Sequence, residues 1–419
     1  MGLTRWERRD DAAPTVACIG DSITRGTTGN FETVASLVGW VEQLTRALAE
    51  RSGLPASGGF RGLWRIEEWS RSGTWTRATR ADAFDVAPFG IGLISSGDAI
   101  DELKWWKPAT MRVTELDIYW FDMPGAGAWQ YCIDDRKWQN GPATAAGDNK
   151  LHKLTLTEPV AKRLLIRGFD GTRPCIAPIA GINVRDRSSA RAGPVVHNLG
   201  CPGNLLGDFC RPSAGDPLAL LDDIHADLVT VLFSNDVAFQ HSTRFGEALR
   251  RLVDRVHGYA DVVLMAPFEA RPHRRVDDAI TVRGSDVVRS SSASFRPADV
   301  DTPVRGTNVP PGSTILSVPS GGSARLSGAA TGSNDRGELT IGLRRDAGQQ
   351  AIYRATTEQV ATSMDCAFID LHDEWAGVAG AGWAAADAHG FMSDALHPSQ
   401  LGHDDIAQRV EALLGLRPR

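Results

Sequence analysis

Long apolar runs, paired cysteines and an excess of positive charge are all missing from this sequence of 419 residues. No segment reaches about 18 uninterrupted apolar residues, which a membrane-spanning helix needs, and the first residues carry charges where a secretory signal is apolar. We therefore expect neither a membrane span nor a cleaved signal. The formal net charge of -6 provides no broad basic surface for phosphates, so we do not expect a nucleic-acid partner.

Cysteine is scarce, because the chain has only six, without a CxxC pair or a histidine cluster at metal-ligand spacing. We expect free thiols and no metal site. A Cys201–Cys210 or a Cys132–Cys175 disulfide is the alternative if the protein works outside a cell. Four histidines without ligand spacing are expected at the surface or in loops: His197, His241, His372 and His389.

Apolar segments that read as strands alternate with segments of helical periodicity. The strand-like segments are Thr15–Gly20, Asp227–Phe233, Asp261–Ala266 and Ala367–Leu371, and the helical ones lie near 33–51, 243–257, 347–364 and 399–414. Strands that alternate with helices of this length are typical of crossover units in a parallel sheet. The sequence therefore predicts an α/β core with a parallel sheet, built from residues 14–83, 191–275 and 346–419.

Two further segments lack helical periodicity and are predicted to be β-domains inserted in this core. Residues 84–190 alternate apolar and polar positions between turn signals, which predicts a small β-sandwich with a possible role in carbohydrate binding. Residues 276–345 are rich in serine, glycine and proline and contain short β-like runs. We expect a small β-module there, with disorder as the alternative.

Ser22 lies in the stretch GDSIT, where the first strand ends and the first helix has not begun. Ligands of open α/β sheets bind at this edge, so the hydroxyl is a candidate nucleophile. By itself a serine at such a position is equally a helix or turn cap. The motif needs support from elsewhere in the chain.

That support comes from Asp394 and His397 in the stretch DALHP, just before the last predicted helix. A carboxylate three residues before a histidine can orient the imidazole, whose other nitrogen is then free to face a serine hydroxyl. A helix-entry turn is the alternative for this pair alone. Together with Ser22 it supplies the base that a serine nucleophile requires.

The chain resembles the SGNH/GDSL hydrolase family, whose four sequence blocks occur here in order. They are Ser22 in GDSIT, Gly200 in NLGCPG, Asn235 in SND, and Asp394 with His397 in DALHP. The resemblance covers the three core segments and leaves both insertions unexplained.

The resemblance implies a three-layer α/β/α hydrolase core and a serine esterase with Ser22, Asp394 and His397 as catalytic residues and no cofactor. It also implies an oxyanion hole made by the backbone N–H groups of Ser22 and Gly200 and the side-chain amide of Asn235. In the same block the family has Asn followed by Asp, so we expect Asp236 to support a loop rather than to catalyse.

One position departs from the family pattern. Phe233 stands two residues before Asn235, where the family usually has glycine. A ring at this position could tighten the backbone or fill part of the pocket. The departure therefore bears on the size of the substrate more than on the chemistry.

The first insertion carries an unusual share of the tryptophans of the chain: Trp105, Trp106, Trp120, Trp129 and Trp138. Aromatic rings can stack on sugar rings, but in a small sandwich they also form the core. Trp120, Trp129 and Trp138 are our candidate substrate contacts, with core packing as the alternative.

The second insertion, with ADVDTPVRGTNVPPGSTILSV, resembles small β-modules of tail proteins of actinobacterial phages. This implies a tail-associated location with virion tail partners, or release by lysis; a cytoplasmic location is the alternative. The predicted substrate is an acylated glycan, most simply one that carries O-acetyl or other short acyl esters. A lipase, thioesterase or cell-envelope lipid esterase is one alternative, and a glycan-binding virion adsorption protein without catalysis is another.

Overall fold

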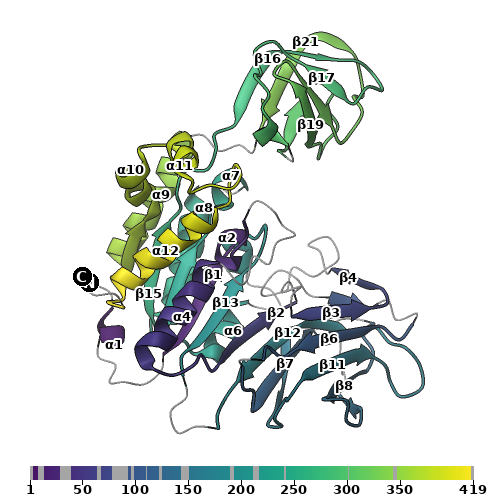
Figure 1. The fold of residues 1–419 in the computed structure, drawn as a ribbon, viewed down its shortest axis with the longest axis vertical. Coiled ribbons are helices and arrows are strands. Elements are labelled where there is room, and N and C mark those ends of the chain that lie inside the picture. The colour runs from purple at the N-terminus through teal and green to yellow at the C-terminus, as the bar shows by residue number, and fades with distance from the viewer. Residues whose placement is uncertain are drawn as a thin grey trace.

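The computed structural model describes residues 3–7, 14–28, 39–63, 68–77, 93–95, 99–109, 111–121, 125–142, 151–188, 193–210, 217–239, 242–300, 302–342 and 347–416. It consists of an α/β core with a β-sandwich beside it and a second β-module set apart from it (Figure 1). Among the described helices, none is both long enough and apolar enough to cross a membrane.

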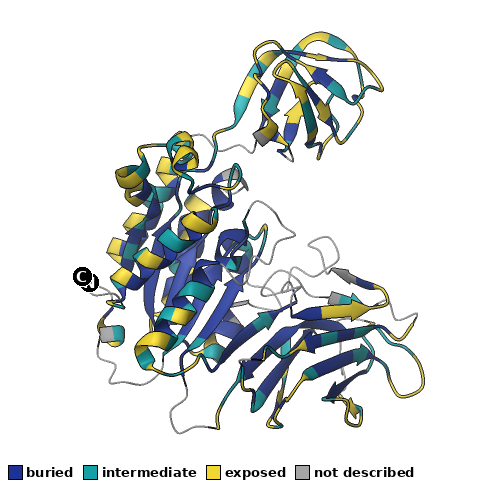
Figure 2. Ribbon diagram, viewed as in Figure 1, coloured by how far each residue is buried: buried dark blue, intermediate teal, exposed yellow. Residues whose placement is uncertain are grey.

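The core is a sheet of parallel strands in the order β2-β13-β1-β14-β15-β22. Their bounds are β1 Thr15–Gly20, β2 Gly58–Gly62, β13 Val195–Gly200, β14 Leu228–Leu232, β15 Asp261–Ala266 and β22 Ala367–Asp370. Four of these strands coincide with the predicted ones to within a residue or two. The strands are almost completely buried, as expected for a parallel sheet covered on both faces (Figure 2).

Helices cover both faces of the sheet. One face packs against α4 (Trp40–Ser52), α10 (Leu371–Ala379), α11 (Trp383–His389) and α12 (Gln400–Leu413). The other packs against α5 (Leu206–Phe209), α6 (Pro217–Ile224), α7 (Asp236–Phe239), α8 (Ser242–Val256) and α9 (Ala347–Ser363). The short helices α1 (Thr4–Glu7) and α2 (Ser22–Arg25) complete the core. Successive residues of β1 alternate between the two layers, since Val16 faces the first and Ala17 the second. The predicted three-layer α/β/α core is confirmed.

The first insertion is a two-layer β-sandwich, and one of its layers continues the core sheet. Strands β12 (Pro178–Arg185), β7 (Glu115–Phe121) and β10 (Leu151–Leu156) extend the sheet antiparallel beyond β2, with β4 (Trp75–Arg77) and β5 (Leu93–Ser95) at its side. The opposite layer has the order β3-β6-β11-β8-β9, with bounds Trp69–Ser72, Glu102–Trp106, Arg163–Gly168, Trp129–Ile133 and Gln139–Asn140. Because β3 and β4 precede residue 84, the β structure begins before the predicted domain boundary.

The second insertion is an independent β-module with an apolar core of its own. Its strands follow the order β18-β21-β16-β17-β20-β19. Their bounds are β16 Arg274–Thr281, β17 Val287–Arg289, β18 Val304–Gly306, β19 Ile315–Ser320, β20 Ser323–Leu326 and β21 Asn334–Ile341. Small and branched side chains such as Val288, Ala324 and Leu339 fill the centre. The chain here is folded, so the alternative of disorder was wrong.

All six cysteines are free thiols. Neither Cys201–Cys210 nor Cys132–Cys175 forms a disulfide. Cys18 is fully buried, and burial raises the pKa of its thiol to about 12, which leaves it protonated at neutral pH.

Candidate active site

Ser22 is the first residue of the short helix α2 and follows the carboxyl end of β1 by two residues. Asp21 caps this helix, because its Oδ1 accepts a hydrogen bond from the backbone N of Ile23 at 3.0 Å. The Ser22 side chain is nearly buried, with 3% of the residue exposed. The sequence-predicted position at the sheet edge is confirmed.

Asp394 and His397 meet Ser22 although 375 residues separate the serine from the histidine. Ser22 Oγ lies 2.9 Å from His397 Nε2, and His397 Nδ1 lies 2.7 Å from Asp394 Oδ2. Both distances are those of good hydrogen bonds. The three side chains thus form one continuous chain from hydroxyl to carboxylate, with the imidazole in the middle.

The turn that carries Asp394 and His397 is tightly closed. The second carboxylate oxygen of Asp394 accepts hydrogen bonds from the backbone N of Leu396 and of His397, both at 2.6 Å. Ser393 donates from N and from Oγ to the carbonyl of His397. Burial opposes ionisation of Asp394, but the hydrogen bonds from His397 and Leu396 outweigh it and hold the pKa of this carboxyl below its usual value. Asp394 is therefore a carboxylate at neutral pH and suits the His397 Nδ1–H donor.

Asp21 connects the nucleophile to the loop after β14, a role that the motif analysis missed. Its Oδ2 accepts from the N and Oγ of Ser234, both at 2.7 Å, and from Asn235 N at 3.0 Å. Asp21 is fully buried. A buried carboxylate with four donors is well satisfied, so it fixes the Ser22 turn relative to the Asn235 loop. The only available signal was its place directly before the serine.

Two of the predicted oxyanion donors, Ser22 and Asn235, lie on segments that Asp21 joins. The Ser22 N–H lies in the first turn of α2, where backbone N–H groups have no partner within the helix. Asn235 is buried at the end of the same loop that Asp21 binds. The direction of its side-chain amide toward an oxyanion stays a prediction.

Gly200 makes two close contacts that the sequence did not indicate. Its N–H donates to Asn198 Oδ1 at 3.1 Å, so this donor already has an acceptor. A Cβ on Gly200 would lie 2.1 Å from the backbone N of Arg25, which shows that glycine is needed here for the close approach of β13 to α2. The role of Gly200 as an oxyanion donor stays a prediction.

Gly203 follows in a tight turn, whose first and last residues are Cys201 and Asn204. The N–H of Asn204 donates to the carbonyl of Cys201 at 3.2 Å, and Gly203 has a φ of 77°. Pro202 before a glycine with positive φ is typical of a type II turn, in which the N–H of that glycine is not used by the turn. An added Cβ would meet nothing within 4 Å, so this backbone is open.

The loops around the site are supported from several sides. The N–H of Thr27 donates to the carbonyl of Ser22, and the carbonyl of Thr27 lies 3.1 Å from His403 Nε2 in the first turns of α12. His403 is fully buried, and burial lowers its pKa to about 4. The carboxylate of Asp236 accepts from the N–H of Leu206 at 3.0 Å, so its expected role in supporting a loop is confirmed. Motif spacing had not indicated Thr27 or His403.

Phe233 does not fill the site. Its ring is 2% exposed and lies in the apolar layer beneath the sheet, with its centroid 6.4 Å from that of Phe209. The side chain that departs from the family pattern is therefore packed in the core.

Of the three candidate substrate tryptophans, two belong to the sandwich core. Trp120 and Trp129 are 4% and 0% exposed, with ring centroids 5.2 Å apart, and so cannot stack on a sugar. That part of the prediction was wrong, because both rings lie in the apolar core between the two layers of the sandwich, which the alternation of residues along the strands did not reveal. Trp138 is half-buried, with the guanidinium of Arg167 3.9 Å from its ring centroid. Its substrate role stays a prediction.

The histidines expected at the surface differ in position. His197 is buried in β13, 2% exposed, which corrects the prediction; burial lowers its pKa to about 3. His372 is half-buried and His389 is exposed, whereas His241 lies outside the described residues.

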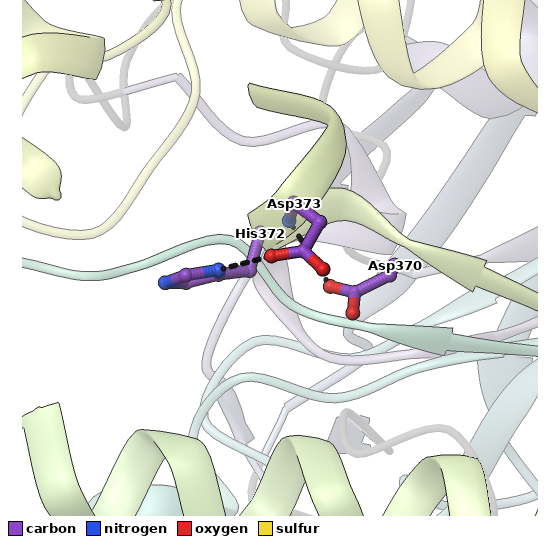
Figure 3. Close-up of side chains that lie close together, drawn as sticks. All are labelled: Asp370, His372 and Asp373. Carbon is purple, nitrogen blue, oxygen red and sulfur yellow. Dashed lines mark hydrogen bonds and ion pairs between the residues drawn. The ribbon is translucent and has the colours of Figure 1, made fainter. Parts of the chain in front are cut away.

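One group of possible metal ligands, Asp370, His372 and Asp373, lies at the end of β22 and the start of α10 (Figure 3). Arg354 forms ion pairs with both carboxylates, and its Nη1 is 3.2 Å from His372 Nδ1. The guanidinium thus already provides the positive charge that these groups require. The chemistry of the cluster is that of an ion-pair network.

Comparison with known proteins shows a similar fold at low sequence identity. No protein-family model and no curated protein matches the sequence. The structure of a peptidoglycan O-acetylesterase matches with a TM-score of 0.56 and 14% identity, over 99% of this chain and 95% of that chain. A lipase/acylhydrolase from Enterococcus faecalis has a TM-score of 0.30 and 15% identity, over 54% of this chain and 80% of that chain.

A family 32 carbohydrate-binding module from C. perfringens NanJ in complex with galactose has a TM-score of 0.20 and 18% identity, over 29% of this chain and 95% of that chain. The likeness to the O-acetylesterase extends over nearly the whole of both chains. It confirms the α/β fold with β insertions that the sequence predicted.

Proposed function

We propose that the protein is a serine esterase that removes O-acetyl or other short acyl groups from an extracellular or cell-surface glycan. The observation that carries the proposal is the unbroken hydrogen-bonded chain from Ser22 Oγ through His397 to Asp394, with distances of 2.9 and 2.7 Å. A serine, a histidine and a carboxylate in this order form the machinery of nucleophilic acyl transfer on unrelated folds.

In the first step Ser22 Oγ gives its proton to His397 Nε2 and attacks the ester carbonyl carbon. Asp394 holds the imidazole by its Nδ1–H and stabilises the imidazolium. The tetrahedral intermediate then collapses, and His397 returns the proton to the leaving alcohol, which leaves an acyl group on Ser22. Water, deprotonated by His397, attacks this acyl-enzyme and releases the carboxylic acid and the free serine.

The negative charge of the tetrahedral oxygen needs donors that are in place before reaction. The N–H of Ser22 and the side chain of Asn235 fit this requirement by position. Because the N–H of Gly200 is bound to Asn198, we assign the third donation to the N–H of Gly203, which the turn from Cys201 to Asn204 does not use.

A glycan substrate is supported by two observations. The solved structure with the similar fold is a peptidoglycan O-acetylesterase. In addition, the outer layer of the sandwich carries Trp106, 44% exposed, with Lys104 and Arg163 within 5.6 Å of its ring centroid, and Trp138 beneath Arg167. Arg163 and Arg167 lie four residues apart on β11 and so are separated by about 13 Å on one face. A polymer with sugar rings suits the exposed ring of Trp106 on this surface.

The activity is tested by ester hydrolysis with native protein, Ser22→Ala, His397→Ala and the double variant. Each single substitution is expected to lower turnover by orders of magnitude, and the double variant to be hardly slower, because the residues act as a unit. Acetate release from acetylated polysaccharides and a series of p-nitrophenyl esters separates a glycan deacetylase from a lipase or thioesterase. Glycan binding without Ser22-dependent hydrolysis would instead support an adsorption protein.

The role of the surface is tested by Trp106→Ala with Trp138→Ala. We expect a lower kcat/KM on acetylated polysaccharide and unchanged hydrolysis of p-nitrophenyl acetate, since only the polymer reaches the sandwich. An equal effect on both substrates in a folded variant would contradict this assignment. The tail-associated location stays a prediction.

A further inference from the structure

The catalytic turn, which carries Asp394 and His397, accepts hydrogen bonds from two donors that lie outside it. The backbone N of Arg271 donates to the carbonyl of Ala395 at 2.8 Å, and Trp383 Nε1 donates to the carbonyl of Asp394 at 3.3 Å. These two carbonyls lie between the carboxylate of Asp394 and the imidazole of His397 along the chain. The orientation of the histidine therefore depends on Arg271 and Trp383 as well as on the turn itself.

Arg271 also reaches the second β-module through its side chain. Its guanidinium lies 5.2 Å from the ring centroid of Trp383 and 2.5 Å from Asp299 Oδ1. Asp299 belongs to the module and is fully buried, and only 10% of the Arg271 side chain is exposed. Both charges of this ion pair are largely removed from water, and the contact therefore joins the module to the core, with Asp299 shared between Arg271 and Arg274.

The carboxylate of Asp299 is itself fixed in the module. Its Oδ2 accepts from the backbone N of Arg296 at 2.8 Å and lies 2.6 Å from Arg274 Nη2. The position of the guanidinium of Arg271 is thereby set by the folded module.

The chain segment between β15 and the module is fixed on the core side as well. Gln350 of α9 binds both the N and the carbonyl of Ala270, at 2.9 and 3.2 Å. Phe268 stacks on Trp375 with a centroid distance of 4.2 Å and an interplanar angle of 11°. The module is therefore joined to the core by a packed connection up to Arg271.

We infer that the second β-module is a structural part of the active site, and that Arg271 transmits its position to the Asp394–His397 turn. Arg271 is a positioning residue in this scheme, since it acts through the turn and through Trp383. The inference rests on the proposed esterase function only for its kinetic consequence. Misplacement of a catalytic group by about 1 Å can lower turnover by about 10²-fold, so a loosened turn is expected to affect kcat.

The kinetic test uses Arg271→Gln and Arg271→Lys on p-nitrophenyl acetate. Arg271→Gln is expected to lower kcat by about 10- to 100-fold with KM within about twofold, because the small ester does not touch the module. Arg271→Lys keeps a cation beside Asp299 and should recover most of the activity. The matched control is Arg275→Gln, which removes an exposed pair with Glu338 in the same module and should leave kcat unchanged.

Trp383→Phe tests the second donor. This variant keeps the ring under the guanidinium of Arg271 but removes the hydrogen bond to the Asp394 carbonyl, and a severalfold loss of kcat is expected. Its control is Trp105→Phe, which removes a similar indole hydrogen bond to Glu68 in the sandwich, far along the chain from the turn.

Combination with His397→Ala shows whether Arg271 acts through the histidine. In that background Arg271→Gln should cause no further loss, because the group that it positions is absent. An additional loss of the full 10- to 100-fold, or equal activity of Arg271→Gln and Arg275→Gln, would overturn the inference.

Hydrogen exchange of the peptide that covers 392–399 provides a readout that does not depend on catalysis. Arg271→Gln should increase its exchange relative to native protein and Arg275→Gln, with the rest of the core unchanged. Absence of Ser22-dependent hydrolysis in native protein would refute the proposed function, whereas unchanged exchange in Arg271→Gln would refute the inference.

Discussion

The two β insertions are joined to the same core in opposite ways. The first shares backbone hydrogen bonds with it, because β12 pairs with β2 and β2 with β13 in one sheet. The second has its own sheet and its own apolar core, and it is connected to the turn that carries Asp394 and His397 through Asp299 and Arg271. An insertion can thus be coupled to a site either by a continuous sheet or by one buried ion pair.

The largest effect on the connection between the first insertion and the core is expected from a substitution of Gly59 in β2. Its φ is +139°, and a Cβ would lie 2.2 Å from the backbone O of Val196 in β13. Gly59→Ala should cost about 4 kcal/mol through clash and strain, and core and sandwich should unfold in one transition at lower temperature. Calorimetry measures the number of transitions and their temperatures. Gly171→Ala is the control, because its φ is +99° but nothing lies within 4 Å of an added Cβ.

The second connection is broken from within the module by Leu339→Ala. Leu339 is fully buried in the module core, and its truncation should cost about 3 kcal/mol. We expect a separate, lower transition for the module, whereas the transition of the core stays in place. Activity above that transition should fall to the level of Arg271→Gln and not to that of Ser22→Ala. A single shifted transition would show that the two units are not independent.

The stability of the core and that of the second β-module should respond differently to acid. His197 and His403 are buried in the core with pKa values of about 3 and 4, lowered by burial, whereas residues 274–342 contain no histidine. Below about pH 6.5 the unfolded chain binds protons that the folded core does not, so stability present above this pH is lost as the pH falls. At pH 5 the loss is about 2 kcal/mol for each histidine.

Melting curves at pH 7 and pH 5 measure this difference. The transition of the core should fall, and that of the module should change little. His403→Gln should reduce the fall, whereas substitution of the exposed His257 should not. Equal shifts of both transitions would contradict the assignment.

The smallest effect is expected at an exposed ion pair of the module. Arg336 and Asp277 are 73% and 74% exposed and 3.0 Å apart. Arg336→Gln should change stability by less than about 1 kcal/mol, as is usual for exposed pairs. A larger loss in chemical denaturation would mean that surface charges hold the module together.

Sequence patterns predicted much of the core and the three residues that form the hydrogen-bonded chain from Ser22 through His397 to Asp394. The helix expected near 243–257 is α8, Ser242–Val256, and the strands around it followed from continuous apolar runs. Ser22, Asp394 and His397 were found because each lies in a short motif whose spacing reflects local geometry. These features depend on residues near in sequence.

The features that were missed depend on contacts between distant segments. The pairing of β2 with β12 joins residues more than 100 positions apart, and no local pattern marks it. Gly200 looked like a donor, but its N–H is bound by Asn198 and its lack of a side chain serves the contact with α2. The sequence pattern around Trp120 indicated a strand. It did not show that both faces of this strand are covered.

We expect Ser22, His397 and Asp394 to form a working hydrolytic triad. The most direct measurement is mapping, by mass spectrometry, of the adduct that a fluorophosphonate forms with native protein and with His397→Ala. We expect one adduct on Ser22, formed orders of magnitude more slowly without His397, since the imidazole activates the hydroxyl. An adduct on another residue, or equal rates in both proteins, would contradict it.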